Sequence, residues 1–87
     1  QLRRDETKAT LIMPVDYYRT FLRHSMAPVD VISNSHHVIR LQVRSMSTLD
    51  VEQLLHPHMD YIDVEPRALK EQIYSSMARK ARRAGSV

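Results

Sequence analysis

The sequence contains no cysteine and no tryptophan, and its only glycine is Gly85, close to the C-terminal end. Without cysteine the chain forms no disulfide, no thiolate nucleophile and no thiolate-bound zinc site. With a single late glycine, it also lacks the glycine-rich loop that cradles phosphates in many nucleotide-binding enzymes. No nucleophile, base and orienting acid can be placed together. These absences predict that the protein is not an enzyme and uses no cofactor.

Long apolar runs are missing as well. No stretch approaches the roughly 20 apolar residues that cross a bilayer, so the sequence predicts no membrane partner and a cytoplasmic or nuclear setting. The 87 residues are 43% hydrophobic and 26% charged, which is typical of one small folded domain. The net charge is only +3, but basic residues gather near the two ends, at 3–4 and 79–83. That placement favours an acidic partner.

The first half of the chain predicts alternating strands and helices. Residues 9–13 are a β-prone run that Pro14 closes, because proline has no amide proton for a sheet. A helix is predicted over 16–24, with Tyr17, Phe21 and His24 on one face. A short helical or turn-like piece at 29–32 is expected to follow. Residues 36–44 then alternate between apolar and polar side chains, which is the clearest strand signal in the sequence.

The second half predicts two more helices and one more strand. Ser47 and Asp50 have the spacing of a capping box, which marks the start of a short helix. His56-Pro-His58 ends it, and a third strand is expected over 59–64. Pro66 opens the last helix, where the apolar positions recur at i, i+4 and i+8, namely Leu69, Ile73 and Met77. The chain is therefore predicted to fold as an α+β domain.

The stretch from Ile12 to Ile32 resembles the first half of a KH domain. In that family a strand is followed by proline, an aromatic pair, arginine, two apolar positions, the loop, and then spaced aliphatic positions. The corresponding residues here are Pro14, Tyr17, Tyr18, Arg19, Phe21, Leu22, Val29 and Ile32. The whole chain is similar to a type I KH domain, in particular to the KH-like repeats of the Bicaudal-C family or of vigilin. The resemblance implies a three-stranded antiparallel sheet packed against helices on one face. The resemblance covers the domain at 9–82, with an insert at about 46–59. The charged residues at the start of the chain predict a flexible lead-in at 1–8, and the end of the apolar pattern before Gly85 predicts a frayed tail at 83–87.

The chain departs from the KH pattern at the loop that contacts RNA. KH domains use a Gly-x-x-Gly loop to bring their backbone against about four nucleotides, and glycine permits this approach because it has no Cβ. Here the loop reads Arg23-His-Ser-Met26. The resemblance therefore implies a KH-like module of a post-transcriptional regulatory protein that acts as a scaffold or protein-interaction domain, with weak or no RNA binding. The alternative is single-stranded RNA binding through basic side chains, namely Arg23, His24, Arg79, Lys80, Arg82 and Arg83.

The predicted insert holds more large apolar side chains than a solvated loop needs. We interpret these side chains as a docking face for a protein partner, a neighbouring KH repeat or a second copy of the chain, formed by Leu49, Leu54, Leu55 and Met59. Five histidines also raise the question of a metal site. The only cluster with suitable ligand types is His56-Pro-His58 with Asp60, and its spacing fits no metal-binding pattern. We therefore predict ordinary loop histidines and no metal.

Overall fold

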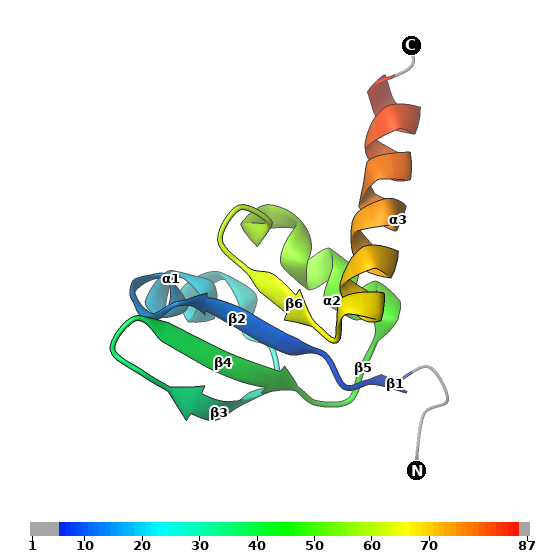
Figure 1. The fold of residues 1–87 in the computed structure, drawn as a ribbon. Coiled ribbons are helices and arrows are strands. Elements are labelled where there is room, and N and C mark those ends of the chain that lie inside the picture. The colour runs from blue at the N-terminus through cyan, green and yellow to red at the C-terminus, as the bar shows by residue number, and fades with distance from the viewer. Residues whose placement is uncertain (1–5, 86–87) are drawn as a thin grey trace.

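The computed structural model describes residues 6–85, with side chains described up to residue 80. It consists of short strands and three helices (Figure 1). In chain order these are β1 (Glu6–Thr7), β2 (Thr10–Pro14), α1 (Val15–Ser25), β3 (Val29–Asn34), β4 (Val38–Val43), β5 (Met46–Ser47), α2 (Thr48–Leu55), the 3₁₀ turn η1 (His56–His58), β6 (Asp63–Glu65) and α3 (Arg67–Gly85). Within residues 6–85, none of the helices has the length and apolar character needed to cross a membrane.

The main sheet has four antiparallel strands in the order β3-β4-β2-β6, and β1 pairs with β5 in a separate two-stranded ladder. The predicted α+β class is confirmed, but the predicted three-stranded sheet is wrong. The connections β2-α1-β3 and β4-α2-β6 each step over one intervening strand, which is the split β-α-β arrangement. Both crossovers lie on the same face of the sheet, so α1 and α2 cover that face (Figure 1).

Strand β2 lies in the middle of the core. Leu11 is opposite Leu41 of β4 on one side and Val64 of β6 on the other, and all three side chains are buried. Because successive side chains of a strand point to opposite faces, Leu11 and Met13 face the helices, whereas Ile12 faces away. The alternation predicted for residues 36–44 is confirmed in β4, where Ile39, Leu41 and Val43 are the buried positions.

Helix α1 confirms the helix predicted over 16–24. It begins directly after Pro14, and the Val15 amide donates to the His37 carbonyl at 2.9 Å. Asp16 lies in the first turn, where a negative charge interacts favourably with the helix dipole. The helix ends where Met26 takes a left-handed conformation with φ of 44°. Phe21 is completely buried and anchors α1 against the sheet.

The segment predicted as a helical piece at 29–32 is a strand instead. Val29–Asn34 forms β3, which pairs with β4 from Val29 opposite Val43 to Asn34 opposite Ile39. The register shifts between Val31 and Ser33, which indicates a β-bulge. The β-branched residues of this segment favour extended backbone, and β4 supplies the hydrogen-bonding partner that makes it a strand.

The predicted insert at 46–59 is part of the fold. The Asp50 amide donates to Ser47 Oγ at 3.1 Å and the Ser47 amide donates to Asp50 Oδ2 at 3.4 Å, so the predicted capping box is confirmed. Val51 and Leu55 of α2 are buried in the core. The strand predicted over 59–64 is the shorter β6, because residues 59–61 form a turn.

The predicted ends of the domain also differ from the structure. Within the predicted lead-in at 1–8, Glu6 and Thr7 form β1, whereas residues 1–5 lie outside the described residues. Helix α3 continues to Gly85, so it enters the predicted tail at 83–87, of which residues 86–87 are not described. Leu69, Ile73 and Met77 of α3 are buried in the core, where α3 contacts both β6 and α2. The remainder of α3 extends away from the sheet (Figure 1).

We expect Ile73→Ala to lower the free energy of unfolding by about 2–5 kcal/mol, because it removes a fully buried side chain and leaves a cavity. The adjacent Gln72 is exposed, so Gln72→Ala should change the stability by less than about 0.5 kcal/mol. Urea unfolding of both variants measures the difference. Equal stabilities would show that α3 is not docked on the sheet.

Candidate functional site

The basic residues predicted to bind RNA are divided between two separate elements, the end of α1 and helix α3. Arg23 and His24 are exposed at the end of α1, where His24 Nδ1 lies 2.9 Å from the Thr20 carbonyl oxygen. Arg79 is exposed on α3, but Lys80 Nζ lies 2.6 Å from Oε1 of Glu52 and lowers the pKa of that carboxyl. The far end of α3 is well separated from α1 (Figure 1). The side chains of the remaining two predicted residues, Arg82 and Arg83, lie outside the described ones.

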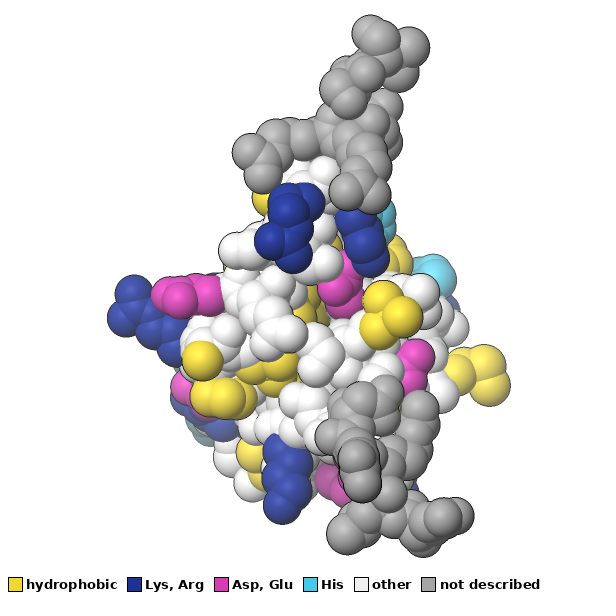
Figure 2. Space-filling model, turned by 90° about the vertical axis from the view of Figure 1, so that its right-hand side faces the viewer, with side chains coloured by type: hydrophobic (Ala, Val, Ile, Leu, Met, Phe, Trp, Pro, Cys, Tyr) yellow, Lys and Arg dark blue, Asp and Glu magenta, His cyan; other side chains and the backbone are white. Residues whose placement is uncertain are grey.

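The predicted docking face is only partly accessible. Leu49 is half-exposed on α2, and Leu54 and Met59 are partly buried against the core. Leu55 is buried within the core, so its prediction as a partner-binding residue is wrong. The side of the molecule that carries α2 and α3 shows hydrophobic side chains in separate small groups, with charged side chains between them (Figure 2). On this side of the molecule the hydrophobic side chains therefore do not form one continuous apolar surface (Figure 2).

The uncovered face of the main sheet carries paired charges. Arg40 on β4 and Glu65 on β6 form an ion pair of 2.8 Å across β2, and the residues between them on this face include Thr10 and Ile12. No tyrosine or phenylalanine lies on the described strands of the main sheet. Single-stranded nucleic acids bind sheet surfaces by stacking bases on aromatic side chains. This face lacks such a platform.

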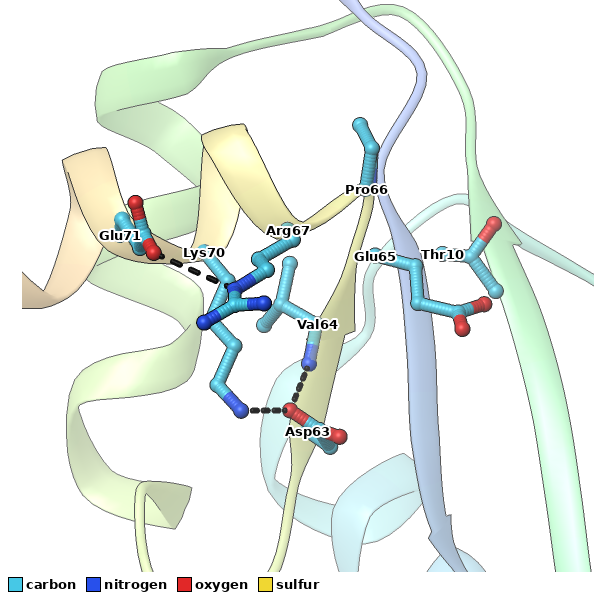
Figure 3. Close-up of a pocket in the computed structure, with 8 residues that line it drawn as sticks. All are labelled: Thr10, Asp63, Val64, Glu65, Pro66, Arg67, Lys70 and Glu71. Atoms are coloured by element: carbon cyan, nitrogen blue, oxygen red, sulfur yellow. Dashed lines mark hydrogen bonds and ion pairs between the residues drawn. The ribbon is translucent and has the colours of Figure 1, made fainter.

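A cavity of about 740 Å³ lies where β6 meets the start of α3 (Figure 3). Lys70 Nζ lies 2.7 Å from Oδ1 of Asp63 and lowers the pKa of that carboxyl, and Arg67 pairs with Glu71 at 3.3 Å. Figure 3 shows these pairs on one side of β6 and Glu65 on the other, beside Thr10. Since Glu65 is paired with Arg40, each charged side chain that lines this cavity already has a counter-ion. The cavity therefore offers little attraction to a charged ligand.

A second group of residues forms a connected polar site around His58. Tyr17, Phe21 and Ser25 lie at i, i+4 and i+8 on one face of α1, and η1 places His58 against that face. The Tyr17 hydroxyl lies 2.5 Å from His58 Nδ1, and Ser25 Oγ lies 3.2 Å from His58 Nε2. The rings of Tyr17 and Phe21 both meet the imidazole edge to face. Both ring nitrogens of a buried histidine are therefore hydrogen-bonded, as buried polar groups require.

The electrostatics of this group disfavour the charged forms of His58 and Tyr17. The His58 side chain is only 5% exposed, and burial lowers its pKa, with a further contribution from the neighbouring His24. Burial raises the pKa of Tyr17, helped by Tyr61 and Asp60. Tyr61 also stacks on Tyr17, with ring centroids 4.4 Å apart. The prediction that the histidines are ordinary loop residues is therefore wrong for His58.

The sequence predicted one part of this site, the inner face of α1, but not the role of His58. The stripe of Tyr17, Phe21 and His24 predicted the inner face of α1, but His24 is exposed and Ser25 occupies the next inward position. In the described part of the chain, no group of three or more histidine, aspartate or glutamate side chains is arranged to hold a metal ion. His58 contacts α1 instead of forming a cluster with His56 and Asp60.

No known family model, no curated protein and no solved structure matches this chain. The KH-like resemblance therefore stays a prediction. The structure differs from that expectation at one informative point, because the segment Arg23–Met26 is followed by strand β3. In a KH domain the loop lies between two helices. The helical piece predicted at 29–32 would have been the second of these helices.

We expect protein stability to fall as the pH is lowered from 7 to 5.5, with His58 as a main cause. In the unfolded chain His58 binds a proton near the ordinary pKa of ~6.5. In the folded protein burial lowers the pKa of His58, so the proton binds only at a lower pH. Acid therefore favours the unfolded state in this window. Urea unfolding at both pH values should show a smaller pH effect in His58→Gln than in the parent. His56→Gln, at an exposed position of the same turn, is the control and should keep the parent's pH effect.

We also expect only weak binding to a ten-nucleotide oligouridine, with a Kd of ~10⁻⁴ M or weaker at physiological salt. Replacing Arg79, Arg82 and Arg83 with alanine while keeping the paired Lys80 should abolish this binding, because it rests on phosphate contacts. Arg23→Ala should change it little. Fluorescence anisotropy at several salt concentrations measures both effects. Tight, base-selective binding that depends on Arg23 would instead support the RNA-binding alternative.

Proposed function

We propose that this chain is a non-enzymatic protein-interaction domain that pairs with a second copy of itself through strand β3. The observation that carries the proposal is the free edge of the main sheet. β3 is an outer strand, it pairs only with β4 among the described strands, and five of its six residues are exposed. An edge strand presents unpaired amide and carbonyl groups that can bind another strand.

The side chains of β3 favour association more than solvation. Val31 and Ile32 are about half-exposed, although β-branched apolar residues are best accommodated within a sheet. Charges on an edge usually discourage pairing, but the one charge on β3, Asp30, is compensated by Arg44 at 2.9 Å. The opposite edge, β6, is only three residues long. β3 is therefore the better of the two edges for adding a strand.

A second copy is a suitable occupant because β3 can pair with itself in an antiparallel register. When Val31 is opposite Ile32 of the second copy, Asp30 is opposite Ser33 and no like charges face each other. A register centred on Asp30 would place two carboxylates together, which is unfavourable. The bulge between Val31 and Ser33 limits how far a partner strand can extend, so we expect a short, reversible contact.

The proposed pairing predicts concentration-dependent dimers in analytical ultracentrifugation. Ile32→Lys should keep the protein monomeric, because lysine on an edge strand opposes pairing. Leu49→Lys is the matched control, since Leu49 is 52% exposed on α2 and Ile32 is 51% exposed on β3. Circular dichroism melting checks that both variants fold.

Three outcomes would contradict this proposal. The parent protein could stay monomeric at every concentration, which would remove the evidence for self-pairing. Ile32→Lys could dimerise like the parent, which would exclude β3 from the interface. Loss of dimers in Leu49→Lys alone would transfer the interface to α2, as the sequence first suggested.

A further inference from the structure

A cavity of about 520 Å³ lies between the end of α1, the loops that flank the β3–β4 hairpin, and the end of α2 with η1. Its apolar lining includes Met26, Met46 and Leu54, and its polar lining includes Ser25 and His58. A volume of this size is within the range of small-molecule sites, which are mostly apolar with a few polar groups that fix orientation. The cavity therefore connects the His58 site to the protein surface.

The hydrogen-bond chain from Tyr17 through His58 ends at this cavity. A neutral imidazole donates at one nitrogen and accepts at the other, so the chain from Tyr17 to Ser25 runs in one direction or the reverse. In one direction His58 donates to Ser25, and the Ser25 hydroxyl proton remains to be donated. In the other direction Ser25 donates to His58, and the Ser25 oxygen remains to accept. Either way Ser25 keeps hydrogen-bonding capacity for a group that donates and accepts.

The charges around the cavity favour an uncharged ligand. Among the described residues that line it, Asp50 is the one acidic side chain, His24 and His58 are the titratable nitrogen bases, and no lysine or arginine takes part. A carboxylate ligand would meet Asp50 without a cationic counter-ion. An ammonium group donates but cannot accept, so it would fit Ser25 in only one of the two directions of the chain. Desolvating an unpaired charge is costly.

We propose that this cavity binds an uncharged small molecule that carries an amide or hydroxyl group on a short apolar tail. The polar group bonds to Ser25 at the end of the Tyr17–His58–Ser25 chain. The tail lies against Met26, Met46 and Leu54. This site involves none of the residues of β3, so it is independent of the proposed self-association.

N-butylacetamide is a suitable probe. Its binding is measured by ¹H–¹⁵N NMR titration of the full chain at pH 7. We expect saturable shifts in the amides of Ser25, Met26, Met46 and Leu54. Pentanoate has the same butyl tail but carries a negative charge, and it should bind about tenfold more weakly because it loses hydration without a cationic counter-ion. Equal binding of the two probes, or shifts located elsewhere, would overturn the proposal.

Two variants test the polar and apolar halves of the site separately. Ser25→Ala should weaken N-butylacetamide binding about fivefold, as expected for one neutral hydrogen bond, whereas Ser75→Ala on the exposed side of α3 should have no effect. Met26→Gly keeps the left-handed conformation at the end of α1, which glycine adopts readily. This variant should bind N-butylacetamide about threefold more weakly, because an apolar contact is lost. Its binding of N-methylacetamide should be unchanged. Unchanged affinity in both variants would exclude this cavity.

Discussion

Strand β2 is hydrogen-bonded on both sides, to β4 and to β6, and the rest of the structure depends on this double pairing. Its buried side chains, Leu11 and Met13, must face apolar partners on one side of the sheet. Because β3 and β6 both join the sheet beyond an intervening strand, the chain has to cross over the sheet twice. The helices α1 and α2 make those crossings on the same face and thereby enclose the core.

The same arrangement explains why the two sheet edges differ. The first crossover places β3 beyond β4, where the helices leave Val31 and Ile32 half-exposed. The second places β6 beside β2, where α3 packs on it and Lys70 binds Asp63. One edge is therefore short and flanked by charged pairs, whereas the other is twice as long and exposes Val31 and Ile32. The interaction surface that we propose on β3 rests on the strand order and not on any motif in the residues of β3 itself.

The packing of η1 on α1 links the core to the candidate ligand site. His58 bonds through both ring nitrogens to side chains of α1, and these bonds offset the loss of water around a buried imidazole. The same contacts hold the end of α1 beside α2, so that Ser25 and Met26 border the cavity. The buried His58 thus combines a structural contact with a lowered pKa.

Much of the fold was predictable because its signals are local. The alternation of 36–44, the helix at 16–24, the capping box of Ser47 and Asp50, and the apolar stripe of α3 each depend on residues that are close in sequence. The α+β class follows from these elements together. The edge of the sheet was harder, since 29–32 is too short to show a clear period, and only pairing with β4 makes it a strand.

The sequence by itself determined most of the longer regular segments and their apolar positions, because periodicity, capping and proline act within a few residues. Only the tertiary structure decided how those positions are used. Leu54 and Leu55 are neighbours, yet Leu55 belongs to the core and Leu54 lines a cavity. His56 and His58 flank the same proline, yet one is exposed and the other is buried against α1. These differences depend on contacts between distant segments, which local sequence patterns do not encode.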